Sequence, residues 1–414
     1  MQYGCIAEHL GHSFSPEIHA LLGEYPYELR ELAPEEVGPF LQKGDFLGIN
    51  VTIPYKETVI PYLSELDEGA RRIGAVNTVV NRGGRLCGYN TDFYGMRALL
   101  ARIGVSLAGR KVAVLGTGGT SRTARAVAES LGAREILSVS RNARAGVITY
   151  DALYRDHADL EYIINTTPVG MYPHPDAAAV DPSRFPHLLG VADAVYNPVR
   201  PRLILEARRL GIPSEGGLFM LIAQAKRASE IFLDTVYPEG TEERIYGTLL
   251  RRKENLVLVG MPGSGKTTVG RLLAQALGRE LVDTDELIVR ADGRTIPEIF
   301  AEEGESFFRA LETRVIGERV SQRNGLVVAT GGGAILRQEN VDALRRNGRI
   351  YFLDRSPDEL IPTDDRPLAS SAEDIRRRYA ERYERYLEAA DVRIAISGDA
   401  EWVSETIGKD FFKT

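Results

Sequence analysis

The chain has little cysteine, with only Cys5 and Cys87 in 414 residues. Two cysteines cannot form a disulfide framework, so we expect a reducing compartment, the cytoplasm. No apolar run approaches the roughly 20 residues needed to cross a bilayer. Glu8, His9 and His12 stand where the apolar stretch of a signal peptide would lie. The formal net charge of −7 leaves no basic footprint for nucleic acid or an anionic membrane, whereas small phosphorylated ligands are still allowed because local sites can be positive.

Hydrophobic residues make up 43% of the chain and charged residues 26%, which is typical of a globular protein of about two or three domains. Short apolar runs alternate with helical stretches, and this pattern predicts an α/β fold built from parallel strands. The runs that we interpret as buried strands are Val112–Leu115, Ile136–Val139, Tyr162–Ile164, Leu256–Val259 and Leu326–Ala329.

Two of these strands lead directly into glycine-rich turns, at residues 116–119 and 260–266. A nucleotide-binding α/β domain normally needs one such turn, so we expect two nucleotide sites. The charged stretch 249–255 precedes a new first strand and is the candidate boundary between the two halves.

The second turn reads Gly260-x-x-x-x-Gly265-Lys266-Thr267, a complete Walker A motif between a strand and a helix. Its glycines let successive backbone N–H groups point at phosphate oxygens, and the following helix adds its positive end. Lys266 would reach the β- and γ-phosphates, and Thr267 would offer a hydroxyl to Mg²⁺. This context disfavours a chance glycine-rich turn.

Asp283 and Asp285 follow the apolar pair Leu281-Val282, at the carboxyl end of a strand where α/β folds bind ligands. Carboxylates two residues apart can serve different purposes, one toward Mg²⁺ and one toward an acceptor hydroxyl. The alternative is a cap for the helix that follows, a common use of aspartate.

Further motifs accompany this loop in a fixed order. They are Asp283-Thr284-Asp285, Ile296-Pro297-Glu298-Ile299-Phe300, Gly304-Glu305-Ser306-Phe307-Phe308-Arg309, Val328-Ala329-Thr330-Gly331-Gly332-Gly333, Asp365-Arg366-Pro367-Leu368 and Arg382-Tyr383-Glu384-Arg385-Tyr386. Together with the Walker A loop, the series resembles shikimate kinases. The resemblance implies a P-loop kinase domain with a parallel sheet, similar to nucleoside-monophosphate kinases, over residues 255–414.

The same resemblance implies the roles of individual residues. The shikimate-binding set is Asp285, Arg309, Gly332 and Arg382; the ATP-binding set is Gly263, Ser264, Gly265, Lys266, Thr267, Thr268 and Arg366; the catalytic set is Lys266, Asp285 and Arg366, with Thr267 and Asp283 for Mg²⁺. Two guanidiniums suit a carboxylate because each can form a bidentate pair. The alternative for Arg309 and Arg382 is a solvated helix face. The approach to Arg366 is shorter than is usual in the family.

The first glycine turn, residues 116–121, approximates a dinucleotide-binding fingerprint but lacks its last glycine. After the next strand, Arg141 and Arg144 stand where an NAD site usually places an acidic residue. Two arginines favour the 2′-phosphate of NADP. The alternative is an arginine-rich surface turn.

Motifs on both sides of this turn resemble shikimate dehydrogenases over residues 1–245. They are His12-Ser13-Phe14-Ser15-Pro16, Asn50-Val51-Thr52-Ile53-Pro54-Tyr55-Lys56, Gly74-Ala75-Val76-Asn77-Thr78, Gly88-Tyr89-Asn90-Thr91-Asp92, Asn165-Thr166-Thr167-Pro168-Val169-Gly170-Met171, Asp193-Ala194-Val195-Tyr196-Asn197-Pro198 and residues 216–224. The resemblance implies a substrate domain of residues 1–104 with 205–247, a Rossmann-like NADP domain of residues 105–204, and a linker of residues 248–254.

This second resemblance implies that Lys56 donates a proton and that Asp92 orients it. The implied substrate-binding set is Ser13, Ser15, Thr52, Lys56, Asn77, Asp92, Tyr196 and Gln224; the NADP-binding set is Gly116, Thr117, Gly118, Gly119, Thr120, Arg141, Asn142, Arg144, Ala194 and Gly217. Each has an ordinary alternative: Ser15 with Pro16 reads as a helix N-cap, and Lys56 as a solvated lysine.

The two resemblances name consecutive reactions. We therefore expect a bifunctional enzyme that reduces 3-dehydroshikimate with NADPH and phosphorylates shikimate with Mg·ATP, with small molecules as its partners. One alternative is a quinate/shikimate dehydrogenase using NAD, fused to the same kinase. The other is a ligand-sensing regulator on the same folds, but Lys56, Asp92, Lys266, Thr267 and Asp285 are all retained.

Overall fold

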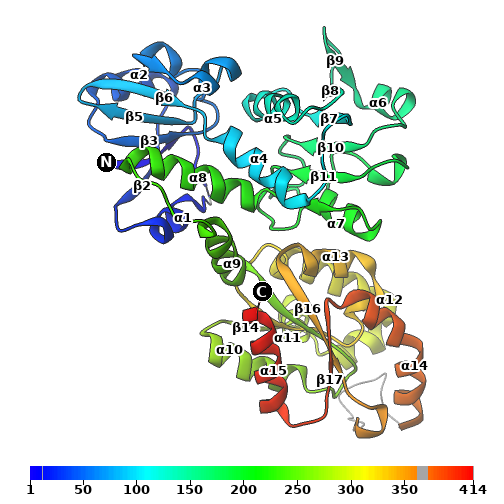
Figure 1. The fold of residues 1–414 in the computed structure, drawn as a ribbon. Helices are drawn as coiled ribbons and strands as arrows, with labels where there is room; N and C mark the ends of the chain where they lie inside the picture. The colour runs from blue at the N-terminus through cyan, green and yellow to red at the C-terminus, as the bar shows by residue number, and fades with distance from the viewer. Residues whose placement is uncertain (12, 361–371, 414) are drawn as a thin grey trace. The chain divides into compact units, whose positions relative to one another are not determined.

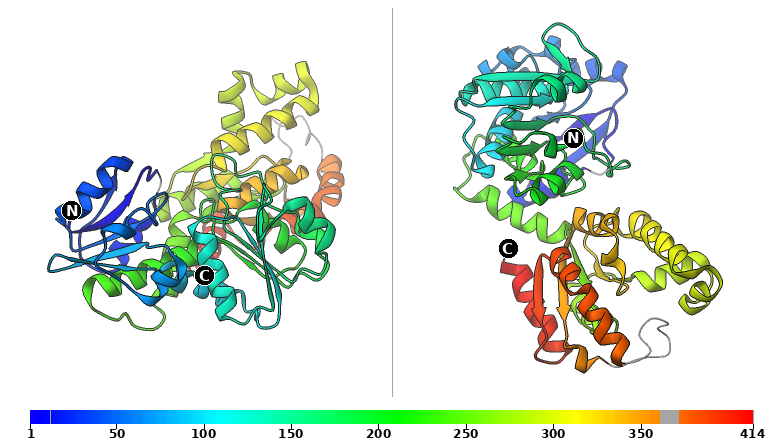
Figure 2. Two further views of the ribbon diagram at one scale, coloured as in Figure 1. Left: turned by 90° about the horizontal axis from the view of Figure 1, so that it is seen from above. Right: turned by 90° about the vertical axis from the view of Figure 1, so that its right-hand side faces the viewer.

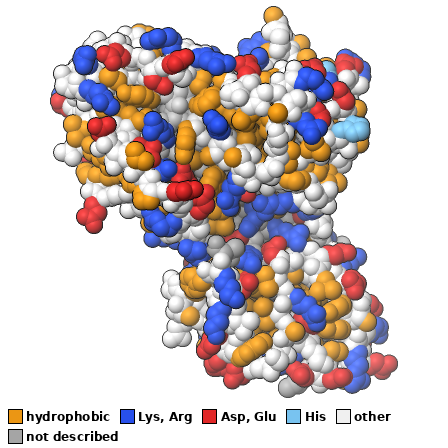
Figure 3. All heavy atoms as spheres, viewed as in Figure 1, with side chains coloured by type: hydrophobic (Ala, Val, Ile, Leu, Met, Phe, Trp, Pro, Cys, Tyr) orange, Lys and Arg blue, Asp and Glu red, His pale blue; other side chains and the backbone are white. Residues whose placement is uncertain are grey.

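A computed structural model describes residues 1–11, 13–360 and 372–413 of the chain. Its internal contacts divide the protein into two compact units, Met1–Leu249 and Leu250–Thr414 (Figure 1). No helix within these described ranges is long and apolar enough to cross a membrane. On the face drawn in Figure 3, acidic and basic side chains both appear across each unit.

The first sheet of the Met1–Leu249 unit has the strand order β2-β1-β3-β5-β6-β4. Its strands are β1 (Tyr3–Ala7), β2 (Tyr27–Glu31), β3 (Gly48–Val51), β4 (Glu65–Leu66), β5 (Thr78–Arg82) and β6 (Arg85–Tyr89), with helices α1 (Ser15–Leu22), α2 (Pro34–Lys43) and α3 (Glu68–Ile73). Strand β1 is parallel to β2 and β3, whereas β5 is antiparallel to β3 and β6. Successive side chains of a strand point to opposite faces, so Val79 packs in the cluster with α2 while Val80 packs against Phe232.

The second sheet has the order β12-β11-β10-β7-β8-β9, and every pairing in it is parallel. Its strands are β7 (Lys111–Leu115), β8 (Glu135–Ser140), β9 (Val147–Thr149), β10 (Tyr162–Asn165), β11 (Gly190–Asp193) and β12 (Ser214–Glu215), with helices α4 (Asp92–Ile103), α5 (Gly119–Ser130), α6 (Tyr150–Asp156), α7 (Arg202–Arg209) and α8 (Leu218–Leu233). Val112 and Val114 pack toward α4 and α5, and Ala113 and Leu115 pack toward α6 and α7. Because the first strand, β7, lies between β8 and β10, the order reverses there, and this is where such sheets bind ligands.

The sheet of the Leu250–Thr414 unit is also parallel, in the order β14-β15-β13-β16-β17. Its strands are β13 (Asn255–Val259), β14 (Leu281–Asp283), β15 (Val327–Ala329), β16 (Gly348–Asp354) and β17 (Val392–Ala395), with helices α10 (Lys266–Leu277), α11 (Thr284–Asp292), α12 (Ile296–Val315), α13 (Gln338–Asn347), α14 (Ala372–Ala389) and α15 (Ala400–Lys413). Leu256 and Leu258 pack with α10 and α15, whereas Val257 and Val259 pack with α14. The right-hand view of Figure 2 accordingly shows the strands between red α15 and orange α14.

The α/β class and the expected buried strands are confirmed, but one expected domain limit is wrong. The limit between residues 204 and 205 falls inside helix α7, whose Leu203, Ile204 and Ala207 pack together on the second sheet. Strand β12 then pairs in parallel with β11, with Val191 opposite Ser214. The segment through residue 215 therefore belongs with the second sheet. Helix α8 packs on both sheets, with Met220 in the cluster of the second and Phe232 against Val80 of the first.

The stretch expected as a linker, residues 248–254, is helical over most of its length. Helix α9 (Thr241–Lys253) crosses the boundary between the units, with Ile245 and Leu249 buried in a cluster with Phe14 and Ile18 of the first unit. The backbone N–H of Glu254 still donates to the Leu250 carbonyl, at 2.7 Å. Burial of Ile245 and Leu249 stabilises the helix. The charged residues 251–253 made this segment look like a linker in the sequence.

A proline inside α9 tests this continuous helix. Leu250→Pro should lower the free energy of unfolding by about 3 kcal/mol, because proline removes a helical N–H and clashes with the preceding turn. Leu250→Ala is the matched control, since alanine keeps the helix. Denaturant unfolding of both variants measures the difference; equal stability of the two variants would contradict a helix through residue 250.

Candidate active sites

Lys56 and Asp92 form an ion pair that the sequence could not place by spacing. Lys56 follows β3, and Asp92 is the first residue of α4. The Lys56 Nζ lies 2.5 Å from Asp92 Oδ2, and the two side chains are only 13% and 9% exposed. A largely buried ammonium held by a carboxylate is kept oriented with its protons available, which a general acid requires.

Asn77 joins this pair to the surrounding elements. Its amide Nδ2 donates to Asp92 Oδ1 at 2.9 Å and lies 3.4 Å from Gln224 Oε1 on α8. Its Oδ1 accepts from the backbone N–H of Thr91 at 2.7 Å. The structure therefore brings Lys56, Asn77, Asp92 and Gln224 together around one carboxylate.

Ser13 and Ser15 lie at the start of α1, where the structure differs from the N-cap interpretation. Phe14 occupies the N-cap position and no side chain caps this helix end within the described residues. Ser15 is the first helical residue, and its N–H donates to Ser13 Oγ at 3.3 Å. Tyr196 packs on Phe14, the residue between the two serines, with ring centroids 5.3 Å apart.

Thr52 lies next to the Asn77 cluster along the backbone. Its neighbour Val51 donates its N–H to the Asn77 carbonyl at 2.8 Å, and Thr52 itself donates to the carbonyl of Ile6 at 3.1 Å. Thr52 is thus held beside the cluster at the end of β3, although no side-chain bond joins it to Asp92 among the described contacts.

The first glycine turn lies against the proposed acid. Gly116 follows β7 with a φ of 106°, and α5 begins at Gly119. A Cβ built on Gly119 would lie 3.7 Å from Cδ of Lys56. A nucleotide bound at this turn, where the helix N-terminus favours anions, would therefore lie close to Lys56.

The remaining cofactor candidates lie at the ends of neighbouring strands. Arg141 and Arg144 follow β8 and are exposed, and the Arg144 backbone pairs with Val147. A Cβ at Gly217 would lie 2.2 Å from the carbonyl oxygen of Ala194, so only glycine fits this close approach.

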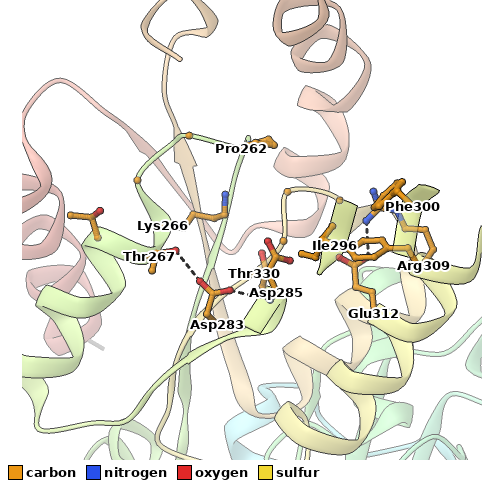
Figure 4. A pocket seen from close by; sticks show the side chains of 17 residues that line it. Pro262, Lys266, Thr267, Asp283, Asp285, Ile296, Phe300, Arg309, Glu312 and Thr330 are labelled. Carbon is orange, nitrogen blue, oxygen red and sulfur yellow. Dashed lines mark hydrogen bonds and ion pairs between the residues drawn. The ribbon is translucent and has the colours of Figure 1, made fainter. Parts of the chain in front are cut away.

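In the second unit, the Walker A residues form the turn between β13 and α10. Gly263 and Gly265 have φ values of 85° and 95°, which favour glycine. Lys266 is buried, and its Nζ donates to the carbonyls of Gly260 and Met261, each at 2.9 Å. Gly263, Gly265 and Lys266 line a cavity of about 440 Å³. Figure 4 shows Lys266 with the other labelled side chains of this cavity.

Asp283 caps a helix with one carboxylate oxygen and contacts the P-loop hydroxyl with the other. Its Oδ1 accepts the N–H of Asp285 at 3.0 Å and so caps α11, while its Oδ2 accepts from Thr267 Oγ1 at 2.9 Å (Figure 4). A carboxylate beside the P-loop hydroxyl suits Mg²⁺, which usually takes one or two carboxylates plus substrate phosphates. Among the described residues, no group of three or more His, Cys, Asp or Glu could hold a metal ion.

Arg309, Asp285 and Gly332 converge on the same cavity. Arg382, which is buried, donates from Nη1 to the Gly332 carbonyl at 3.2 Å, and Tyr386 donates to the same oxygen. A Cβ at Gly331 would lie 2.5 Å from Asp285 Oδ1, so a larger residue there would displace this carboxylate. Arg309 and Arg382 are thus buried near the cavity and do not form a solvated helix face.

Glu312 is a site residue that the sequence reasoning missed. It is fully buried in the cavity wall, and its Oε2 accepts from Arg309 Nη1 at 2.8 Å. Burial raises the pKa of this carboxyl, and Arg309 opposes the rise. The signal was present, because residues three apart on a helix lie side by side. Glu305 also pairs with Arg309, at 3.1 Å.

Apolar side chains that line this cavity were also missed, because they carry no chemical signature. They are Ile296, Phe300 and Phe308. Arg366, expected as the lid arginine, and residues 361–365 of the approach to it lie outside the described residues.

Comparisons with known proteins agree with this division. Residues 5–79 match the family model for the shikimate dehydrogenase substrate binding domain, and residues 262–411 match that for shikimate kinase. A shikimate dehydrogenase (NADP(+)) of Clostridium perfringens is 35% identical over 265 residues, which cover 60% of this chain and 97% of that protein.

Solved structures match the same part of the chain. Shikimate dehydrogenase 1 from Peptoclostridium difficile is 32% identical with a TM-score of 0.55, covering 60% of this chain and 98% of that one. Shikimate 5-dehydrogenase from Thermus thermophilus, solved in complex with NADP(H) and shikimate, is 27% identical with a TM-score of 0.54, covering 59% and 98%.

Proposed function

This chain belongs to the shikimate dehydrogenase family over the 60% that its relatives cover, and on that premise we propose how its two halves divide the work of a bifunctional shikimate-pathway enzyme. The first half reduces 3-dehydroshikimate to shikimate with NADPH. The second half phosphorylates the 3-hydroxyl of shikimate with ATP. The observation that carries the proposal is the Lys56–Asp92 pair beside a glycine turn, in the same chain as a P-loop cavity lined by Asp285 and Arg309.

In the first half, Lys56 donates the proton of the reduction. NADPH supplies the hydride, which adds to the carbonyl carbon and builds negative charge on the oxygen. The Lys56 ammonium stabilises this charge and transfers its proton to the oxygen, and Asp92 stabilises and orients the ammonium. Ser13 and Ser15 bind the substrate carboxylate through hydroxyls. Thr52, Asn77, Tyr196 and Gln224 hold the ring hydroxyls.

The proposed NADP pocket combines the glycine turn with side chains and backbone from three strand ends. It comprises Gly116, Thr117, Gly118, Gly119, Thr120, Arg141, Asn142, Arg144, Ala194 and Gly217. The exposed arginines after β8, with no acidic residue among residues 140–144, support NADP over NAD.

In the second half, Asp285 holds the acceptor hydroxyl and takes its proton as the oxygen attacks the γ-phosphorus. Lys266 binds the β- and γ-phosphates, and Thr267 and Asp283 hold Mg²⁺. Arg309 and Arg382 bind the carboxylate, together with the Gly332 backbone. The ATP-binding group is completed by Gly263, Ser264, Gly265, Thr268 and Arg366, the last as a further cation over the transferring phosphate.

The cellular location that fits this proposal is the cytoplasm. Cys5 and Cys87 are both free and buried. Burial raises the pKa of the Cys5 thiol to about 12, so it stays protonated and unreactive. Small-molecule substrates are the only partners that the proposal requires.

Lys56→Ala tests the first site. Loss of the proton donor should lower kcat for NADPH-dependent reduction of 3-dehydroshikimate by about 10²–10⁴-fold, the usual contribution of general acid catalysis. Reduction is followed by NADPH absorbance. Shikimate-dependent ATP consumption by the same sample should be unchanged, which controls for the amount of protein; a fully active variant would contradict the assignment.

Lys266→Ala tests the second site in the opposite sense. Without the phosphate-binding ammonium, shikimate-dependent ATP consumption should fall by about 10²–10³-fold, as when one charge-stabilising donor is removed. Oxidation of shikimate with NADP⁺ should stay at the unaltered rate. Kinase activity that survived the substitution would place phosphate binding elsewhere.

Arg141→Ala and Arg144→Ala separate NADP from NAD. Each lost charge-assisted hydrogen bond should raise the KM for NADPH by about 10-fold or more. NADH lacks the 2′-phosphate and is the matched control, so its KM should not change in either variant. Equal effects on both cofactors, or a native preference for NADH, would favour the NAD-dependent alternative.

A further inference from the structure

Asp193, at the end of β11, has a buried carboxyl group that takes no part in the mechanism proposed above. We propose that Asp193 is a positioning residue of the dehydrogenase, holding the loops after β10 and β11 in the shape that the cofactor pocket needs. This inference rests on the proposed cofactor site. Its geometric basis is that one carboxylate oxygen joins two loops.

The Asp193 side chain is fully buried. Its Oδ1 accepts from Asn165 Nδ2 and from the Val195 backbone N–H, each at 2.9 Å. Asn165 ends the neighbouring strand β10, so Asp193 spans two adjacent strand ends at the edge where parallel sheets bind ligands.

Asn165 carries the effect of Asp193 toward the glycine turn. Its Oδ1 accepts from the N–H of Thr167 at 3.0 Å and from the Thr167 hydroxyl at 2.7 Å. A backbone N–H can only donate, so this contact fixes the amide orientation and requires its Nδ2 to face Asp193. A Cβ at Gly116 would lie 2.8 Å from Thr166 Oγ1 and 3.2 Å from Thr167 Cγ2. The Thr166-Thr167 segment thus packs directly on the first residue of the glycine turn.

The hydrogen bond from Val195 to Asp193 fixes the loop after β11, on the other side of the proposed cofactor pocket. Val195 donates its N–H to Asp193, and the Val195 carbonyl accepts the N–H of Gly217 at 2.9 Å. Ala194 donates to the Asn165 carbonyl, also at 2.9 Å. Asp193 therefore connects three segments that carry or contact proposed NADP residues.

These two bonds are what Asp193 contributes, because its burial is otherwise unfavourable. Its Oδ2 is buried without a hydrogen-bond partner among the described residues. Burial raises the pKa of this carboxyl to about 7, and the hydrogen bonds from Val195 and Asn165 oppose the rise. No basic side chain is among the causes of the shift, so an ion pair does not explain the residue.

The test compares substitutions in the full-length chain by steady-state kinetics. Asp193→Ala should raise the KM for NADPH by about 10-fold, as expected for two lost hydrogen bonds. The KM for 3-dehydroshikimate and the kinase activity should be unchanged. Asp193→Asn should stay within about 3-fold of the unaltered KM, because an amide oxygen accepts the same two bonds.

Two further variants separate positioning from stability. Val191→Ala, on the same strand and fully buried, removes core packing but no bond to the loops, so its KM for NADPH should not change. Asn165→Ala should raise the KM for NADPH as much as Asp193→Ala does. The double variant should raise it no further, because the two residues belong to one series of hydrogen bonds.

Each contrary outcome is decisive. An unchanged KM for NADPH in Asp193→Ala, an equal rise in Val191→Ala or Asp193→Asn, or a rise in the KM for 3-dehydroshikimate instead would overturn the proposal. If Asp193→Ala does not fold, an unchanged KM for NADPH in Asn165→Ala overturns it equally. Failure of the unaltered protein to reduce 3-dehydroshikimate would instead refute the proposed function.

Discussion

A cation that is largely removed from water needs a carboxylate beside it, and both candidate active sites depend on this requirement. Lys56 is paired with Asp92, and Arg309 is paired with the buried Glu312. In each pair the carboxylate comes from a helix, so the position of the charge follows the packing of that helix. The sites are therefore as rigid as the cores beneath α4 and α12, and the charged groups lose little entropy when a ligand binds.

The sequence predicted what depends on local chemistry. Glycine turns after apolar strands need only a few neighbouring residues, and the turns at Gly116 and Gly260 lie where they were expected. The pairing of Lys56 with Asp92 depends on how β3 and α4 pack, and spacing alone carries no such information. Only the family resemblance suggested it.

Other features were missed for different physical reasons. Glu312 had a readable signal, three residues after Arg309 on one helix, but charged residues at that spacing usually form solvated surface pairs. The predicted domain limit between residues 204 and 205 was wrong because β12 is only two residues long and gives no periodic pattern in the sequence. Helix α9 was hidden because its last turn is charged while its packing positions lie earlier.

In the proposed mechanism the two halves bind the same ring carboxylate by opposite means, and the difference follows from the charges around each reaction. The first site already holds the Lys56 ammonium, and a guanidinium nearby would repel it. Neutral hydroxyls at Ser13 and Ser15 avoid that cost. In the kinase, ATP brings several negative charges, so Arg309 and Arg382 bind the carboxylate and also offset repulsion between the two anions.

The same charges give the reaction sequence a direction. Reduction of the ketone is reversible, and the kinase step consumes its product with the free energy of ATP. The phosphorylated product gains about two negative charges at the hydroxyl that reduction of the ketone produced. In the proposed first site that hydroxyl would lie beside the Lys56–Asp92 pair and Asn77, where the Asp92 carboxylate would repel a phosphate.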